Sequence, residues 1–360
     1  MGPERLPAGE VFVIVNANAR RFVEARSLLL DIDRLVEGRA TLRVTRSRRE
    51  LASAAGDAHA ARARVVVLCG GDGSYGAGVT AVADAWGKEA LPLFAFAPGG
   101  TVGTVARSLG VAVSGPAFDG IARLVHTCVS GTAKHLDTPT LSVETESDRR
   151  IGRRAGSTPA LSPSESIGFI FGTGLVASFF ELYDPRAAEA ERAALLGEPI
   201  VDAPSGGGGT AAAAKIVARV FAESFVGGPY ARRVLEPLRC DITVDGVPLD
   251  WPASSLVVAS VLRDLGLGMR VTHRGGENPD RPHVVVSGLP PRKLGPRMPR
   301  VLRGLPIGGP PEPHFDGLAG ELAVSFPEHP GPFVIDGDLR IARRVVVRAG
   351  PRVSVVMPSS

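Results

Sequence analysis

The sequence has few cysteines and few aromatic residues. Its three cysteines, at positions 69, 128 and 240, are widely spaced and form no CxxC pair. This pattern argues against a disulfide framework or a cysteine zinc site and is typical of a reducing cytosol. Aromatic residues make up 5% of the chain. Without a basic helix or a known recognition module, a nucleic-acid partner is not expected.

Long apolar runs are also missing. A membrane-spanning helix needs about 20 largely apolar residues, and no stretch of the sequence approaches that length without charge. The apolar run 11–15 follows a start that carries proline and charge, and it is too short for the core of a signal peptide. We therefore expect a cytoplasmic protein, peripheral at the inner membrane surface if it contacts a membrane at all.

The chain can bury sizeable cores. It has 360 residues, of which 44% are hydrophobic and 22% charged, and it carries a formal net charge of +4. This length predicts two domains, and this composition is that of a folded protein. Most basic residues are arginine, which fits either a general compositional bias or contact with anionic lipid or phosphate.

The N-terminal part alternates strand-like and helix-like patterns, which predicts a parallel α/β sheet covered by helices. From Leu136 onward, short β-rich runs recur between glycine, proline and aspartate, which predicts an antiparallel β domain. We expect domains at 1–135 and 136–340 and a final segment, 341–360, whose strand returns to the N-terminal domain. The expected strands of the first domain are 11–15, 41–44, 65–69 and 93–97, with helices at 22–36, 48–63, 76–86 and 101–109. In the second part we expect a polar insert at 149–165 and a helical stretch at 187–225 interrupted by a loop at 205–209.

Two glycine-rich turns follow expected strands. Strand 65–69 runs into Gly70-Gly71-Asp72-Gly73-Ser74, and strand 93–97 runs into Pro98-Gly99-Gly100-Thr101. Glycines at the carboxyl end of a parallel strand let the backbone approach a ligand closely, and the N-terminus of a following helix attracts an anion. Asp72 can orient the water around Mg²⁺ on a polyphosphate. Each turn alone could simply reverse the chain, but together they indicate a nucleotide phosphate cradle.

These turns resemble the diacylglycerol kinase catalytic family, which includes bacterial lipid kinases and sphingosine kinases. GGDGS at 70–74 and PGGTVGTVAR at 98–107 are similar to that family's GGDGT and P-x-GT-x-N-D-x-A-R motifs, and NANAR at 16–20 is similar to N-P-x-S-G. In the second half, residues 136–138, 168–177 and 334–338 resemble later motifs, the last of them D-G-E. The resemblance implies an NAD kinase/diacylglycerol kinase-like nucleotide-binding domain, a C-terminal antiparallel β-sandwich, and an active site between them.

The resemblance further implies a lipid kinase that transfers the terminal phosphoryl group of ATP to a diacylglycerol-like or sphingoid hydroxyl with Mg²⁺. Asp72 would organise the metal, Asp336 would be the catalytic base, and Asp338 would support the metal or the orientation. The implied nucleotide-binding residues are Asn16, Gly70, Gly71, Gly73, Ser74, Gly99, Gly100, Thr101 and Arg107.

Several positions depart from the family pattern, which keeps alternatives open. Gly76 and Ala77 stand in place of Asn and Glu, Gly103 in place of Asn, and Thr104 in place of Asp. A catalytically impaired lipid- or nucleotide-binding protein, or a kinase of a soluble acceptor such as NAD or a sugar phosphate, is therefore the alternative. A homodimer is also left open.

Two further segments bear on partners. The stretch 291–303 mixes five basic residues with leucine, methionine and valine, which suits an anionic membrane surface or a solvated helix broken by proline. Histidines at positions 126, 135, 273, 283, 314 and 329 show no metal-ligand spacing, so packed or solvated histidines are expected.

Overall fold

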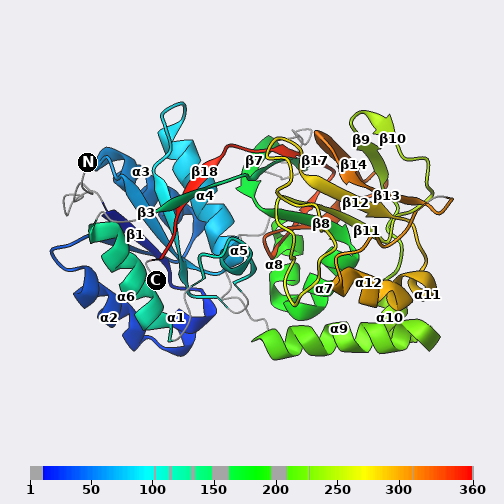
Figure 1. The fold of residues 1–360 in the computed structure, drawn as a ribbon, viewed down its shortest axis with the longest axis horizontal. Helices are drawn as coiled ribbons and strands as arrows, with labels where there is room; N and C mark the ends of the chain where they lie inside the picture. The colour runs from blue at the N-terminus through cyan, green and yellow to red at the C-terminus, as the bar shows by residue number, and fades with distance from the viewer. Residues whose placement is uncertain are drawn as a thin grey trace, which may run out of the picture. The chain divides into compact units, whose positions relative to one another are not determined.

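The chain forms two compact units, shown in Figure 1. The computed structural model describes residues 11–100, 103–112, 116–130, 134–147, 162–195, 209–226, 228–309 and 311–358. Unit 1 comprises residues 1–138 and 352–360, and unit 2 comprises residues 139–351.

Unit 1 contains the six-stranded sheet A, in the order β2-β1-β3-β4-β18-β5. The first four strands run parallel to one another, as the alternating pattern predicted. The carboxyl ends of these four strands therefore lie along one edge of the sheet. The strands are β1 (Val11–Asn16), β2 (Thr41–Thr45), β3 (Val65–Gly70), β4 (Leu93–Pro98), β5 (His135–Thr138) and β18 (Val353–Val356).

Helices cover both faces of sheet A. On one face, α1 (Arg20–Glu24), α2 (Ser27–Val36) and α6 (Ala117–Ser130) bury apolar side chains against alternate residues of β1 and β3. On the other face lie α3 (Arg48–Ala60) and α4 (Asp72–Trp86), and a Cβ atom on Gly78 of α4 would come within 2.7 Å of the Leu68 side chain. The predicted helix 22–36 is thus two helices, separated at Ala25, and the one expected at 101–109 is the short α5 (Thr104–Ser108).

The end of the chain is shared between the two units. Strand β17 (Arg344–Ala349) belongs to unit 2, where it pairs with β14 and β6, whereas β18 enters sheet A. There β18 runs parallel to β4 and antiparallel to β5, and Val355 lies opposite both Phe94 and Leu136. The segment that joins unit 1 at the end of the chain is therefore 352–360 rather than the expected 341–360.

Unit 2 contains two antiparallel six-stranded sheets, as the β-rich pattern predicted. Sheet B has the order β10-β9-β14-β17-β6-β7, and sheet C has the order β13-β12-β11-β8-β15-β16. Residues 162–165, expected in the polar insert, are the start of β7, and 149–161 lie outside the described residues. The strands are β6 (Leu141–Ser147), β7 (Ser162–Gly168), β8 (Ile170–Gly174), β9 (Asp241–Val244), β10 (Val247–Pro248), β11 (Leu256–Ser260), β12 (His283–Ser287), β13 (His314–Leu318), β14 (Glu321–Ser325), β15 (Gly331–Ile335) and β16 (Asp338–Ala342).

Helices of unit 2 pack against one face of sheet C. Leu256 and Val258 of β11 and Val285 of β12 share a buried apolar cluster with residues of helices α9, α10, α11 and α12. Gly209, the last residue of the expected loop 205–209, begins α9, and 205–208 lie outside the described residues. The helices are α7 (Leu175–Tyr183), α8 (Pro185–Leu195), α9 (Gly209–Val226), α10 (Pro229–Val234), α11 (Pro291–Leu294) and α12 (Met298–Leu302), with the 3₁₀ helix η2 (Gly295–Arg297).

Candidate active site

The strand order of sheet A singles out one position on its edge. The chain passes from β1 outward to β2 and then returns to place β3 on the other side of β1. In open α/β sheets, ligands bind beyond the carboxyl ends of the strands at the point where the strand order reverses. The first glycine turn follows β3 directly, so the topology places it at the expected binding position.

The two glycine turns contact each other through their backbones. The N–H groups of Gly99 and Gly100 both donate to the carbonyl oxygen of Gly70, at 2.8 and 2.9 Å. A Cβ atom on Gly100 would lie 2.4 Å from the Cα atom of Gly71, and one on Gly99 would lie 3.0 Å from that of Gly70. Only glycine allows this approach, because the neighbouring atoms are main-chain atoms that cannot turn away.

The loop after β1 also contacts the first glycine turn, between the two strands where the order of sheet A reverses. The side-chain amide of Asn16, at the end of β1, donates to Ser74 Oγ at 2.9 Å, and the N–H of Asn18 donates to Asn16 Oδ1 at 3.0 Å. A Cβ atom on Gly70 would lie 2.4 Å from the Ser74 Cβ atom, so glycine is also required here. Asn16, Gly70 and Ser74, which sequence analysis assigned to nucleotide binding, therefore lie together.

Three residues that the sequence motifs did not single out also hold these loops. The N–H of Arg21 donates to the Gly99 carbonyl at 3.1 Å, and a Cβ atom on Gly99 would lie 2.5 Å from the Phe22 ring. Tyr75 is buried, donates to the Ala97 carbonyl at 2.9 Å and stacks on Phe96. Their position directly after Asn16–Arg20 and after Ser74 was the available signal.

Asp72 connects the first turn to the start of α5. Its carboxylate accepts hydrogen bonds from the N–H groups of Thr104, at 2.8 Å, and Val105, at 2.9 Å. Burial raises the pKa of the Asp72 carboxyl, although these two amides and the nearby Arg107 act in the opposite direction. The Thr104 side chain also hydrogen-bonds to this carboxylate. A carboxylate offers about four acceptor positions, so the group can still accept a hydrogen bond from metal-bound water.

The departures from the family pattern have different structural consequences. Gly103, which precedes α5, has a φ of 60° and a ψ of 45°, the left-handed conformation that glycine and asparagine adopt most readily. Glycine therefore preserves the backbone that asparagine would have there, but it offers no side-chain amide. Gly76 and Ala77 lie within α4 and likewise contribute no polar side chain. Thr101 lies outside the described residues.

The edge of sheet A suits a polyphosphate. It combines a closely packed glycine backbone with the first turn of α4, which begins at Asp72 and contains Gly73, and with the exposed guanidinium of Arg107 in α5. The first N–H groups of a helix have no partner within the helix and favour an anion. A Cβ atom would fill the space that the glycines leave, so the residues present fit phosphate groups.

Asp336 of unit 2 occupies a tight hairpin turn. With φ values of 50° and 89°, Asp336 and Gly337 form the two-residue connection between β15 and β16. The Asp336 side chain is 4% exposed, and its carboxylate accepts hydrogen bonds from the N–H groups of Phe169, at 3.0 Å, and Ile170, at 2.8 Å. This carboxylate therefore fixes the junction between β7 and β8 to the hairpin.

Asp338 begins β16 and is paired with an arginine. Its Oδ2 atom accepts from Nε and Nη2 of Arg340, at 3.2 and 3.1 Å, and Arg340 Nη1 donates to Ser166 Oγ at 2.7 Å. A metal ion at Asp338 would have to compete with this guanidinium. Asp137, which the resemblance also picked out, lies in β5 of unit 1 and accepts from Ser354 Oγ at 2.7 Å.

The contact between the glycine turns predicts the effect of an added methyl group. Gly100→Ala should lower the free energy of unfolding of unit 1 by about 1–3 kcal/mol, because the methyl group overlaps the Gly71 backbone. Urea unfolding measures this change. As a matched control, Gly56→Ala in α3 meets nothing within 4 Å and should stabilise by up to about 1 kcal/mol. Equal stability of the two variants would contradict the contact.

The Asp336 contacts predict a stability loss for an isosteric change. Asp336→Asn keeps the size of the side chain and tolerates the positive φ, and its oxygen can still accept from the Phe169 and Ile170 N–H groups. Its amide nitrogen, however, takes the place of the Oδ2 atom, which accepts from the Phe169 N–H at 3.1 Å, so two donors would face each other in a buried position. Unit 2 should lose about 1–3 kcal/mol, measured by chemical denaturation. Asp338→Asn, which weakens the ion pair between a 36% exposed carboxylate and Arg340, should cost less than Asp336→Asn, because the Asp338 side chain is much better solvated. If Asp336→Asn is as stable as the unaltered protein, the buried contacts do not hold the turn.

Comparisons with known proteins agree with this architecture. The diacylglycerol kinase catalytic domain family matches residues 10–139. A candidate diacylglycerol kinase from Bacillus anthracis str. Sterne has a similar fold, with a TM-score of 0.56 and 16% identity over 99% of this chain and 98% of that one. A second diacylglycerol kinase structure from the same organism gives 0.54 and 13% over 97% of each chain. None of the curated proteins matches the sequence. The two structures show the shared fold, and residues 10–139 match the diacylglycerol kinase catalytic domain that the motifs of the sequence resemble.

Proposed function

We propose that this protein is a lipid kinase that uses Mg²⁺ and ATP. The family match supports a kinase, and the contact between the two glycine turns at the reversal point of sheet A is the observation that carries the nucleotide assignment. Phosphoryl transfer depends mainly on positioning and on charge stabilisation, which backbone amides around a phosphate supply. Bound Mg²⁺ would neutralise charge that develops on the phosphates.

The proposed roles follow from the contacts in unit 1. The backbones of Gly70–Gly73 and Gly99–Gly100 would hold phosphate oxygens, and Asn16 would keep Ser74 oriented toward the same edge. Asp72 would accept hydrogen bonds from water on the metal while it holds the start of α5. Arg107, which is exposed and close enough to Asp72 to oppose part of the rise in the pKa of that carboxyl, would attract the phosphates.

Turnover of an Asp72 variant tests the kinase assignment. The purified protein with Mg²⁺ and labelled ATP should phosphorylate diacylglycerol or a sphingoid base in a panel that also contains NAD and fructose 6-phosphate. Asp72→Asn should reduce turnover at least ~100-fold while circular dichroism shows a retained fold. Asp33→Asn, an exposed change in α2, should have no effect. Phosphorylation of only a soluble acceptor would reject the lipid assignment, and full activity of Asp72→Asn would reject the role of Asp72.

The role of Asp336 is decided by the same assay. The resemblance implies a catalytic base, but a base must reach the proton of the acceptor hydroxyl, and this carboxylate is 4% exposed and faces two amides. A positioning role agrees better with these contacts. A loss of at least ~100-fold in turnover per folded Asp336→Asn molecule would support the base, and near-normal turnover per folded molecule would support positioning.

A nucleotide-binding protein without turnover is the second candidate. It is favoured by Gly76 and Ala77, which place no polar side chain in the first turns of α4, and by the buried position of Asp336. Calorimetric binding of ATP together with the absence of any phosphorylated product in the panel would favour this candidate over the kinase.

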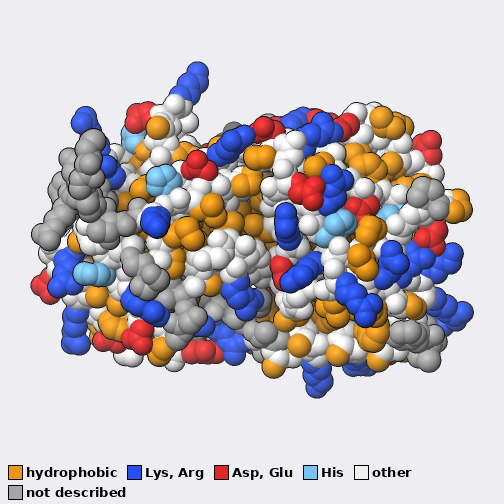
Figure 2. Space-filling view, viewed as in Figure 1, with side chains coloured by type: hydrophobic (Ala, Val, Ile, Leu, Met, Phe, Trp, Pro, Cys, Tyr) orange, Lys and Arg blue, Asp and Glu red, His pale blue; other side chains and the backbone are white. Residues whose placement is uncertain are grey.

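The proposed lipid acceptor requires contact with a membrane surface. Among the described residues, no helix combines the length and the apolarity needed to cross a bilayer. We propose that the segment α11–α12 and the loop after it contact an anionic cytoplasmic surface through Arg300, Leu302, Arg303 and Leu305. Leu302 and Leu305 are 49% and 43% exposed, and Figure 2 shows basic and hydrophobic side chains side by side over this segment.

Other residues of this segment have structural tasks. Leu294 and Val301 are buried in the apolar cluster between sheet C and its helices. Arg297 makes a bidentate ion pair with Glu312, with distances of 2.6 and 2.7 Å. The membrane proposal therefore depends on fewer side chains than the sequence alone indicated.

Vesicle binding tests this surface. The unaltered protein should sediment with vesicles of phosphatidylglycerol and phosphatidylcholine, less in high salt, and not with phosphatidylcholine alone. The double variant Arg300→Gln/Arg303→Gln should bind at least ~10-fold more weakly, since each basic residue contributes about 1 kcal/mol. Arg239→Gln, which alters a 78% exposed arginine of the same unit, is the control. Equal binding of both variants would reject this surface.

A further inference from the structure

Three histidines and one aspartate of unit 2 lie together although they are far apart in the sequence. His283 is the first residue of β12, and His314 and Asp316 lie in β13, the neighbouring antiparallel strand. In the observed register Val285 pairs with Asp316 and Ser287 with His314, so the alternation of side chains places His283, His314 and Asp316 on one face of sheet C. His273 comes from the connection between β11 and β12.

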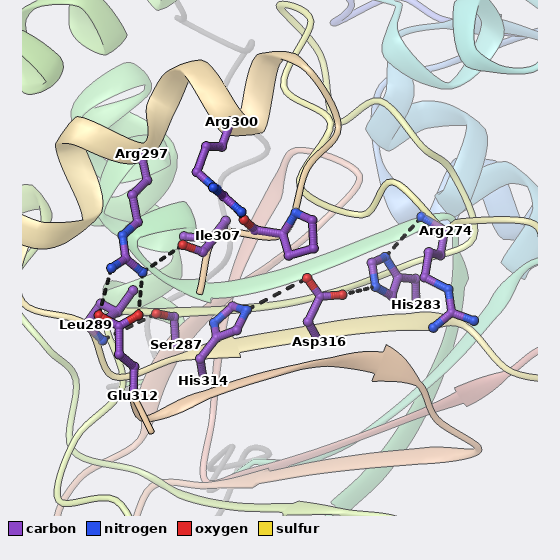
Figure 3. Close-up of polar contacts among 11 residues, drawn as sticks. Arg274, His283, Ser287, Leu289, Arg297, Arg300, Ile307, Glu312, His314 and Asp316 are labelled. Atoms are coloured by element: carbon purple, nitrogen blue, oxygen red, sulfur yellow. Dashed lines mark hydrogen bonds and ion pairs between the residues drawn. The ribbon is translucent and has the colours of Figure 1, made fainter. Parts of the chain in front are cut away.

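The side chains approach within reach of a common ion (Figure 3). His283 Nε2 is 2.8 Å from Asp316 Oδ1, and His314 Nε2 is 3.7 Å from Asp316 Oδ2. One ligand atom each from His273, His283 and Asp316 lies within 4.8 Å of the others. These side chains are only 0% (His283), 12% (Asp316) and 2% (His314) exposed, so solvent water has little access to hydrogen-bond with them.

Unpaired polar atoms gather in this cluster. In the part of the chain that the structure describes, every buried side-chain nitrogen or oxygen without a hydrogen-bond partner belongs to it: His273 Nδ1, His314 Nδ1, His314 Nε2 and Asp316 Oδ2. Buried polar groups nearly always have a hydrogen-bond partner, and each buried group without one lowers the stability of the fold by about 1–3 kcal/mol. Two of the four atoms, His273 Nδ1 and Asp316 Oδ2, belong to side chains that could bind one ion together with His283, which points to a ligand at this side of the cluster.

We propose that His273, His283 and Asp316 bind one divalent transition-metal ion of the zinc class, with His314 positioning the Asp316 carboxylate. Two imidazoles and one carboxylate are donors that suit Zn²⁺, whereas Mg²⁺ prefers oxygen ligands alone. A tetrahedral ion held by three protein ligands has one further position for water. This site is separate from the Mg²⁺ proposed for phosphoryl transfer, and its residues belong to none of the family motifs.

Metal binding must change which ring nitrogen of His283 carries the proton. The N–H of Arg274 donates to His283 Nδ1 at 3.3 Å, which leaves the ring proton on Nε2, facing Asp316. A metal at Nε2 requires this proton on Nδ1 instead, so the long hydrogen bond from Arg274 would be given up. No net proton is released from this ring, and the Arg274 amide becomes a reporter of the bound state.

The charges around the cluster are compatible with a cation. The Asp316 carboxylate lies between two imidazoles, with Oδ1 2.8 Å from His283 Nε2 and Oδ2 3.7 Å from His314 Nε2, so it is an acidic group placed among neutral nitrogen donors. The Arg274 side chain is directed to Glu277, with which it forms an ion pair of 3.0 Å. A metal here would fix the long connection 261–282 to strands β12 and β13. Such a cross-link would reduce the conformational entropy that this loop loses when the chain folds.

Metal titration of the full-length protein tests the proposal without nucleotide or lipid. After treatment with EDTA and dialysis, the protein should bind one equivalent of Zn²⁺ in a chelator competition, and Zn²⁺ but not Mg²⁺ should raise the melting temperature. His273→Gln and Asp316→Asn should each weaken Zn²⁺ binding at least ~10-fold. His329→Gln, an exposed histidine of the same unit, should bind like the unaltered protein.

A second measurement on the unaltered protein does not depend on how the variants fold. Zn²⁺ should shift the Arg274 amide and move the His283 ring proton to Nδ1 in nitrogen-correlated NMR spectra. The absence of one-equivalent binding, unchanged affinity in both variants, or an unperturbed His283 ring at saturating Zn²⁺ would each overturn the site. Kinase activity does not enter these readouts, so the two proposals can fail separately.

Discussion

The backbone contact between the two glycine turns is the constraint on which the candidate site depends. Because the N–H groups of Gly99 and Gly100 donate to the Gly70 carbonyl, the turns after β3 and β4 form one surface. That contact brings the start of α5 within reach of the Asp72 carboxylate, which holds it through two amides. The loop after β1 then joins through Asn16 and Arg21. The two glycine turns are thus held by main-chain contacts that a larger side chain would prevent, and the third loop is attached by one side-chain and one main-chain hydrogen bond.

Acidic residues of the recognised motifs have a structural role in both units. Asp72 holds the beginning of a helix in unit 1, and Asp336 holds the junction of two strands to a hairpin in unit 2. Each uses its carboxylate to accept from main-chain N–H groups that would otherwise lack partners. A residue can therefore belong to a family motif because it shapes the backbone. The turnover of a variant at such a position has to be compared with its folding stability, because a loss of fold also lowers turnover.

Much of the fold could be predicted because local pattern and tertiary environment agree. Strands β1, β3 and β4 are apolar runs with buried centres that end in asparagine, glycine and proline, so their bounds were found to within one residue. The helix predicted at 22–36 is broken at Ala25, although its apolar spacing continues across the break, because α1 and α2 pack separately on the same core. Strand β7 begins in a segment rich in serine and proline, where pairing with β6 outweighs weak strand propensity.

The sequence by itself determined the α/β order, the two glycine turns and the resemblance of residues 10–139 to a kinase catalytic domain, because each depends on residues that are close along the chain. Tertiary structure alone decided that Asp336 faces backbone amides and that His273, His283 and Asp316 meet. The strand that returns to sheet A was expected, but its bounds were set by pairing with β4 and β5. Strand register determines which distant residues share a face, and spacing along one sequence does not carry that information.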